Sequence, residues 1–323
     1  MTVLSAGKLK RMRALANEAG AIAALAMDQR GALRKMLGKH LEAGRITAER
    51  MAEFKSAVTR ILSPHATAVL LDPEYGLEAA RGRGPNCGLL LSYEKSGYDN
   101  TQPGRLPDLL DHVSVKRIAE DWQADAVKLL VYYTPFEDAG INDVKHALVE
   151  RIGAECETHQ IPFFLEFVGY DPAGGDEKGL EYASKKPEIV TRSMEEFSRP
   201  QYRADVLKVE IPVNIEFIGQ AYSREQALGH FRRAAAAATK PFIYLSAGVT
   251  NAQFVEALGL AAEAGSDFSG VLCGRATWQD GVAVYARHGL AALEDWLATD
   301  GVRNISAVNQ AIRGARPWWV KMR

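Results

Sequence analysis

The sequence has little cysteine and no excess of one charge, and both absences exclude classes of protein. Its 323 residues include only three cysteines, Cys87, Cys156 and Cys273. Three thiols cannot all pair and their spacing is not that of a metal site, so a reducing compartment is the simplest inference. With a formal net charge of -1, the chain has no excess of positive charge that would indicate binding to nucleic acid or to an anionic membrane. We therefore expect no nucleic-acid partner.

Long apolar runs are also missing. No segment approaches the ~20 apolar residues that a membrane-spanning helix needs, and the basic start, residues 1–13, lacks the apolar part of a secretory signal. We therefore expect a cytoplasmic protein without a membrane partner. With 47% hydrophobic residues and no Gly, Ser or Pro tract between two halves, the chain is expected to form one domain over residues 1–323.

The chain lacks a glycine-rich phosphate turn after an early strand, which an open, doubly wound sheet would need. Instead, helical patterns alternate with short apolar strands. The predicted strands are residues 21–28, 66–72, 88–95, 124–133, 161–170, 205–213, 241–248 and 268–275. The predicted helices are residues 8–19, 47–62, 114–123, 142–159, 187–197, 224–239 and 251–264. Residues 96–107 are predicted to form a long loop, which in a barrel would lie over its mouth. This α/β alternation predicts a single closed (β/α)8 TIM barrel with an N-terminal helix and a C-terminal tail; an open sheet is the alternative.

The strand at residues 205–213 carries charge on one of its two faces. Leu207 and Val209 point one way, whereas Lys208 and Glu210 point the other. Charged side chains on the inner face of such an apolar strand are costly unless they are paired or used. We interpret Lys208 as an amine nucleophile, and a lysine ion-paired in the barrel lining is the structural alternative.

Other strands break their apolar pattern in the same way near their carboxyl ends, where (β/α)8 barrels carry their chemistry. The alternation of side chains predicts six polar residues inside the barrel at this face: Asp28, Lys128, Glu166, Lys208, Ser246 and Arg275. Packing alone does not explain four strands that each place a charge on one face. We infer a catalytic site.

These residue types suit carbonyl chemistry through an imine. A lysine pKa near 10.4 leaves roughly one neutral amine in a few thousand at pH 7. Burial and a neighbouring cation such as Lys128 would favour the neutral form of Lys208. Glu166 can shuttle protons during carbinolamine dehydration and carbon–carbon cleavage. Asp28 is interpreted either as a partner for a substrate hydroxyl or as the counter-ion of a lysine.

The last two strands end in patterns suited to phosphate, Ser246-Ala-Gly and Gly274-Arg, which offer backbone N–H groups and a guanidinium fork. Metal chemistry is less favoured, because none of the seven histidines is predicted at a strand's carboxyl end. Carboxylates alone could hold magnesium, but nothing in the sequence requires it. We expect neither a metal nor another cofactor.

Eight blocks spread over nearly the whole chain together resemble one known family. They are AMDQRGA from Ala26, LDPEYGL from Leu71, YEKSGYD from Tyr93, AVKLL from Ala126, PFFLE from Pro162, DVLKVE from Asp205, YLSAGV from Tyr244 and GVLCGRATW from Gly270. In this order the blocks resemble the tagatose 1,6-bisphosphate aldolase family of lysine-dependent aldolases. The segments at residues 81–87 and 171–181 match no block of that family.

The resemblance implies a role for each candidate residue. It implies a Schiff base at Lys208, an acid/base role for Glu166, and supporting catalytic roles for Lys128 and Asp28. The substrate-binding residues that it implies are Gln29, Ser246, Gly248, Gly274 and Arg275. The implied class I aldolase reversibly cleaves a phosphorylated sugar, a ketose 1,6-bisphosphate with D-tagatose 1,6-bisphosphate favoured, to dihydroxyacetone phosphate and D-glyceraldehyde 3-phosphate.

Three alternatives stay open at this point. Related sulfofructose-phosphate aldolases share the plan, so the resemblance does not decide between a phosphate and a sulfonate at the distal end of the substrate. An isomerase on the same fold would need only Glu166 as a base, and a phosphosugar sensor would have no need for an amine nucleophile.

Trp318 and Trp319 in the tail either dock on the barrel or bury in a partner subunit. We expect a homo-oligomer.

Overall fold

A computed structural model describes residues 4–99 and 101–322. Residues 1–3 of the predicted basic start, residue 100 of the predicted mouth loop and residue 323 of the tail lie outside the described residues. No helix in the described ranges is long and apolar enough to cross a membrane.

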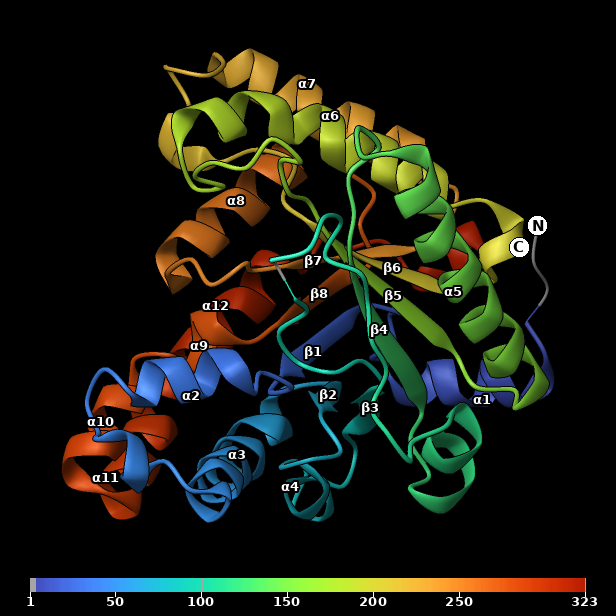
Figure 1. Ribbon diagram of the computed structural model, residues 1–323. Helices are drawn as coiled ribbons and strands as arrows, with labels where there is room; N and C mark the ends of the chain where they lie inside the picture. Colours follow the sequence, from blue (N-terminus) through green and yellow to red (C-terminus); the bar gives the residue numbers. More distant parts are fainter. Residues whose placement is uncertain (1–3, 100, 323) are drawn as a thin grey trace.

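Eight parallel strands close into a barrel in the order of the sequence, surrounded by helices (Figure 1). The strands are β1 (Ile22–Ala26), β2 (Ala68–Leu71), β3 (Gly88–Ser92), β4 (Ala126–Tyr132), β5 (Phe163–Val168), β6 (Val206–Glu210), β7 (Phe242–Leu245) and β8 (Gly270–Cys273). Each lies within a strand predicted from the sequence, so the predicted TIM barrel is confirmed. The predicted strands extend past the sheet at one or both ends, and polar residues near their carboxyl ends, such as Asp28 and Ser246, have already left it.

The α-helices cover the outside of this barrel, and additional helices extend it near the C-terminus. They are α1 (Ala6–Ala14), α2 (Gly31–Leu37), α3 (Ala48–Leu62), α4 (Leu77–Arg81), α5 (Ala139–Thr158), α6 (Leu180–Phe197), α7 (Arg224–Ala237), α8 (Asn251–Glu263), α9 (Arg275–Trp278), α10 (Gly281–His288), α11 (Leu290–Trp296) and α12 (Val302–Ala311). The sequence predictions omitted α2, α4 and the helices after β8. Thr47 caps the start of α3, because its side chain accepts a hydrogen bond from the Arg50 amide.

Three helix predictions were wrong in extent. α1 stops at Ala14 and not at residue 19, since Asn17 and Ala21 exchange hydrogen bonds in a turn. α6 begins at Leu180 with Pro187 inside it, because the packing of its buried face outweighs the loss of one backbone hydrogen bond. The helix predicted at residues 114–123 shrinks to a single π-helical turn, Arg117–Asp121.

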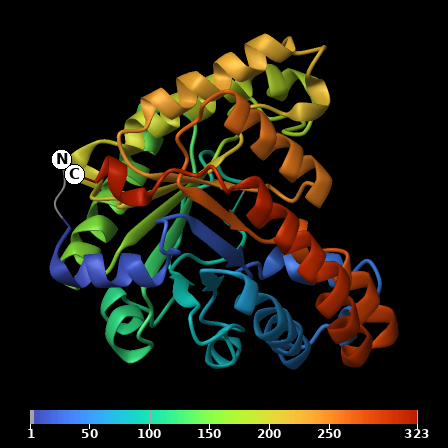
Figure 2. The same ribbon diagram turned by 180° about the vertical axis from the view of Figure 1, so that it is seen from behind.

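Two apolar layers hold the fold together. One lies between the strands and the outer helices, and the other fills the barrel interior with inward-facing side chains such as Ala24, Leu70 and Phe164. Trp318 is buried in the inner cluster, which also includes Met12 of α1, and its amide donates to the Gly20 carbonyl. The C-terminal segment therefore docks on the same chain (Figure 2). The oligomeric state stays a prediction.

Candidate active site

A cavity of about 560 Å³ opens where the strands end. Of the residues predicted from the sequence, it is lined by Asp28, Gln29, Lys128, Glu166, Lys208, Ser246, Gly274 and Arg275. Gly248 lines an adjoining cavity that shares Ser246 with the first. The structure therefore brings the predicted residues together at one end of the barrel.

Strand alternation explains the placement of four of these residues. Ala26, Ala126, Phe164 and Val206 pack in the barrel interior. Asp28, Lys128, Glu166 and Lys208 each follow one of those residues by two positions and so share its inner face.

Alternation does not explain the placement of Ser246 and Arg275. They stand two positions after Tyr244 and Cys273, whose side chains lie in the outer apolar layer, so alternation would direct them outward. Both reach the cavity because they come after the strand has ended. β7 ends at Leu245, and Arg275 is the first residue of α9.

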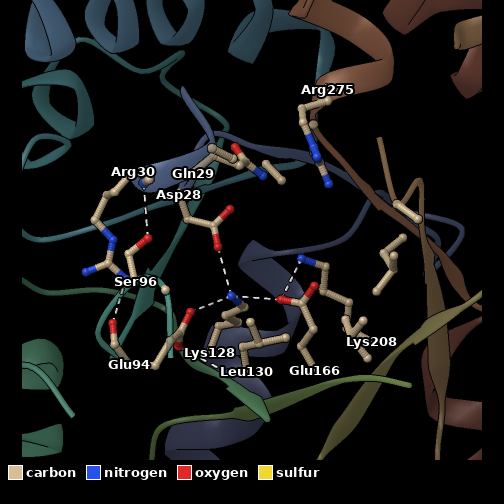
Figure 3. A pocket seen from close by; sticks show the side chains of 18 of the residues that line it. Asp28, Gln29, Arg30, Glu94, Ser96, Lys128, Leu130, Glu166, Lys208 and Arg275 are labelled. Carbon is tan, nitrogen blue, oxygen red and sulfur yellow. Dashed lines mark hydrogen bonds and ion pairs between the residues drawn. The ribbon is translucent and has the colours of Figure 1, made fainter. Parts of the chain in front are cut away.

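Lys128 lies at the centre of three carboxylates (Figure 3). Its Nζ is 2.8 Å from Asp28 Oδ2, 2.6 Å from Glu94 Oε1 and 2.7 Å from Glu166 Oε2. Burial by itself would lower the pKa of Lys128, but the three negative charges hold that pKa well above its usual value. Lys128 is therefore a permanent buried cation at the bottom of the cavity.

Lys208 contacts the same glutamate oxygen as Lys128. The Lys208 Nζ is 2.9 Å from Glu166 Oε2, and the two residues are register partners on β5 and β6. Lys208 is only 3% exposed and Glu166 8%. One carboxylate oxygen between two buried amines is suited to moving a proton on and off the Lys208 nitrogen.

Asp28 presents an ionised oxygen to the cavity. Burial would raise its pKa, but the charges of Lys128 and Lys208 hold the pKa well below its usual value. Its Oδ2 binds Lys128, while its buried Oδ1 has no hydrogen-bond partner within the described part of the chain. The counter-ion and hydroxyl-binding interpretations of Asp28 are thus compatible, because each uses a different oxygen. Gln29 Oε1 is likewise buried, with no partner among the residues that the structure describes.

The ends of β7 and β8 meet at Gly248 and Arg275. Gly248 has a φ of +81°, and a Cβ there would lie 2.6 Å from Arg275 Cζ. Glycine at this position therefore lets the guanidinium lie against the backbone. Gly274 is also tightly placed, since a Cβ would lie 2.5 Å from the Ala26 carbonyl oxygen. Among residues 4–99 and 101–322, no carboxylate forms an ion pair with Arg275.

Sequence reasoning missed two contributors to the site. Glu94 binds the Lys128 ammonium and also accepts the Leu130 amide at 3.1 Å. Glu94 stands four positions after Leu90 of β3, whose side chain packs in the barrel interior, so the alternation of side chains could have predicted its inward direction. Arg30 donates to the Glu94 carbonyl at 2.6 Å. That contact joins loops after different strands and leaves no local signal in the sequence.

A (β/α)8 barrel in which two buried lysines contact one glutamate defines a class of enzyme suited to amine-based carbonyl chemistry. The chain belongs to the DeoC/LacD family of aldolases, whose sequence model matches residues 22–280. It is 49% identical over 325 residues to tagatose 1,6-diphosphate aldolase 2 of Enterococcus faecalis, covering 99% of this chain and 97% of that protein. It is 47% identical over 328 residues to a tagatose 1,6-diphosphate aldolase of Listeria monocytogenes, covering 99% and 96%.

Solved structures agree in fold. A fructose-bisphosphate aldolase from Plasmodium falciparum superposes with a TM-score of 0.67 at 14% identity, over 98% of this chain and 97% of that chain. A Schiff-base-forming fructose-1,6-bisphosphate aldolase gives a TM-score of 0.55 at 18% identity, over 89% and 97%. At these identities the likeness supports the barrel architecture alone.

Proposed function

We propose that this protein is a class I aldolase that reversibly cleaves a ketose 1,6-bisphosphate to dihydroxyacetone phosphate and D-glyceraldehyde 3-phosphate. The observation that carries the proposal is the contact of Lys208 and Lys128 with the same oxygen of Glu166, at 2.9 and 2.7 Å. The names of the two curated relatives favour D-tagatose 1,6-bisphosphate as the sugar.

Imine formation would begin with attack of the neutral Lys208 amine on the C2 ketone. Glu166, which holds the proton given up by the Lys208 ammonium, protonates the carbonyl oxygen to form the carbinolamine hydroxyl and then takes a second proton from the nitrogen. Protonation of that hydroxyl by Glu166 then releases water and leaves an iminium. Lys128 keeps its own proton throughout, because three carboxylates stabilise its charge.

Cleavage would follow from the iminium, which accepts the electron pair of the C3–C4 bond. A base removes the proton of the C4 hydroxyl, C4 leaves as the aldehyde, and the three-carbon enamine remains on Lys208. Glu166 is within reach of this chemistry through its contact with the Lys208 nitrogen. We assign the hydrogen bond to a substrate hydroxyl to the Oδ1 of Asp28, because this oxygen has no partner among the described residues. Protonation at C3 and hydrolysis then release dihydroxyacetone phosphate.

Borohydride treatment in the presence of dihydroxyacetone phosphate tests the imine directly. Reduction should add one reduced dihydroxyacetone phosphate to the intact mass, and peptide mapping should place it on Lys208. An isomerase that uses Glu166 alone, or a sensor without turnover, would give no adduct. A protein that stays unmodified would refute the proposal.

The near phosphate of the substrate is assigned to the ends of β7 and β8. Its carbon neighbours the ketone that Lys208 attacks, so this phosphate must lie within a few ångströms of the imine. β7 and β8 follow β6 around the barrel. The groups within reach are therefore Ser246, Gly248, Gly274 and Arg275, and a bidentate guanidinium suits a phosphate.

Arg275→Ala should weaken dihydroxyacetone phosphate and the full bisphosphate alike, because both carry the near phosphate. We expect a loss of roughly 2–4 kcal/mol in transition-state binding, the scale of removing a charged hydrogen-bond donor. The measurements are kcat/KM for cleavage and the dihydroxyacetone phosphate concentration needed for trapping, with Arg287→Ala, at an exposed position of α10, as control. If only use of the aldehyde phosphate were impaired, Arg275 would belong to the distal end of the substrate.

Chelators should leave the cleavage activity unchanged. The described residues contain no group of three His, Cys, Asp or Glu side chains arranged to hold a metal ion. The carboxylates of Asp28, Glu94 and Glu166 converge instead on the Lys128 ammonium. The measurement is activity after EDTA dialysis. Activity that is lost to EDTA and restored by zinc would contradict the cofactor-free mechanism.

A further inference from the structure

A buried lysine outside the cavity contacts the end of β1. Lys55 is 0% exposed in the middle of α3, which packs outside β1 and β2 (Figure 1). Its Nζ donates to the Met27 carbonyl at 2.7 Å, the Gln29 carbonyl at 3.0 Å and Asp72 Oδ2 at 2.5 Å. An ammonium has three donors, so none remains for a substrate. Any role of Lys55 in the reaction must act through these partners.

The two carbonyl groups belong to the residues on either side of Asp28. The sheet ladder ends just before, with the Met27 amide bound to the Leu70 carbonyl at 2.8 Å. Asp28 itself follows the end of β1 and reaches Lys128 with its side chain. Lys55 therefore supplies hydrogen bonds at the point where the sheet no longer supports the chain.

The same ammonium joins β1 to β2 through Asp72. Asp72 Oδ1 accepts the amides of Glu74 at 3.1 Å and Tyr75 at 2.9 Å, and so shapes the turn after β2. Both side chains of the Lys55–Asp72 ion pair are 0% exposed. Stability alone explains such a pair poorly, because well-packed apolar residues of similar volume often stabilise a protein as much or more.

We propose that Lys55 is a positioning residue of the active site, which holds the peptide groups around Asp28 so that its carboxylate stays directed at Lys128 and the substrate. This inference rests on the proposed aldolase function. Residues that orient catalytic groups through hydrogen bonds commonly contribute about 10- to 100-fold to activity. The effect should fall on carbon–carbon cleavage, since the Lys208–Glu166 contact does not involve Lys55.

The test variant is Lys55→Met/Asp72→Asn, which removes both charges and leaves no unpaired buried ion. The asparagine side chain introduced in place of Asp72 retains an oxygen acceptor for the two turn amides. The matched control is Lys8→Met/Asp205→Asn. That buried pair, with Nζ and Oδ2 2.7 Å apart, joins α1 to the start of β6 at the opposite end of the barrel.

The cleavage activity of the test and control variants is measured at a temperature well below the thermal unfolding midpoints of both. The Lys55 pair variant should lose about 10- to 100-fold in kcat with little change in KM, while borohydride trapping with dihydroxyacetone phosphate stays at the wild-type extent. The control should lose thermal stability and keep kcat. In an Asp28→Asn background, the Lys55 pair substitution should lower kcat no further, because both changes act on one group.

Wild-type kcat in the Lys55 pair variant, an equal loss in the control, or additive losses with Asp28→Asn would each overturn the inference. If the double variant fails to fold, Lys55→Gln/Asp72→Asn takes its place, since the glutamine amide keeps two donors for the carbonyls of Met27 and Gln29 and no unpaired buried ion remains. It should show a smaller loss of kcat with trapping intact, and unchanged kcat would overturn the inference. Absence of trapping in the wild-type protein would refute the aldolase function itself.

Discussion

Replacing Lys208 with methionine should abolish both cleavage and borohydride trapping in a protein that still folds. Without the amine no imine forms, and we expect a loss of roughly 10⁴-fold or more in kcat, the scale seen when covalent enzymes lose their nucleophile. The fold should survive because Glu166 keeps its ion pair with Lys128, so the substitution leaves no unpaired buried carboxylate. The measurements are cleavage rate, adduct mass and the thermal unfolding midpoint.

The control for this variant is a buried lysine remote from the cavity. Lys8 pairs with Asp205 and does not line the cavity, so Lys8→Met/Asp205→Asn should be trapped on Lys208 as the wild type is. Full cleavage activity in Lys208→Met, or trapping at the wild-type extent in that variant, would rule out Lys208 as the residue that forms the imine.

Glu166→Gln should have the next largest effect, a loss of about 10²- to 10⁴-fold in kcat, the range that general acid–base catalysis contributes. The amide has nearly the same shape, but it cannot carry a proton between the Lys208 nitrogen and the departing water. Lys128 would keep Asp28 and Glu94 as counter-ions, so its charge should persist. Single-turnover trapping with dihydroxyacetone phosphate should therefore slow in parallel with steady-state cleavage.

Glu94→Gln provides the matched comparison for this variant. Glu94 binds Lys128 at 2.6 Å, as Glu166 does at 2.7 Å, but within the described residues Lys208 has an ion pair with Glu166 and none with Glu94. Both substitutions remove one negative charge beside Lys128, and only Glu166→Gln removes a proton carrier from the nucleophile. Equal losses in the two variants would mean that Glu166 acts through the charge of Lys128 and not by proton transfer.

Much of the site could be predicted because strand alternation is a local property. Lys208 stands between Leu207 and Val209, and in a strand of period two that pattern places the amine on the face opposite to these two side chains. The rule depends on the strand continuing. It therefore did not hold for Ser246 and Arg275, which reach the cavity after their strands have ended.

Helix ends were less predictable because they depend on competing interactions. Thr47 caps α3 as its sequence suggests, since capping uses groups three residues apart. Pro187 was read as the start of a helix, but it lies inside α6 because contacts with the barrel compensate for the missing hydrogen bond. The energy that decides this case comes from residues distant in the sequence.

The sequence alone determined the number of strands, the barrel class and the inner-face charges Asp28, Lys128, Glu166 and Lys208, because each follows from a repeat within a single segment. Only the tertiary structure decided which of these groups touch. That Glu166 offers one oxygen to both lysines depends on the register of β4, β5 and β6. The contact of Lys55 with the peptides around Asp28 depends on how α3 packs against β1 and β2. Such contacts join residues far apart in the chain, and no local pattern encodes their distance.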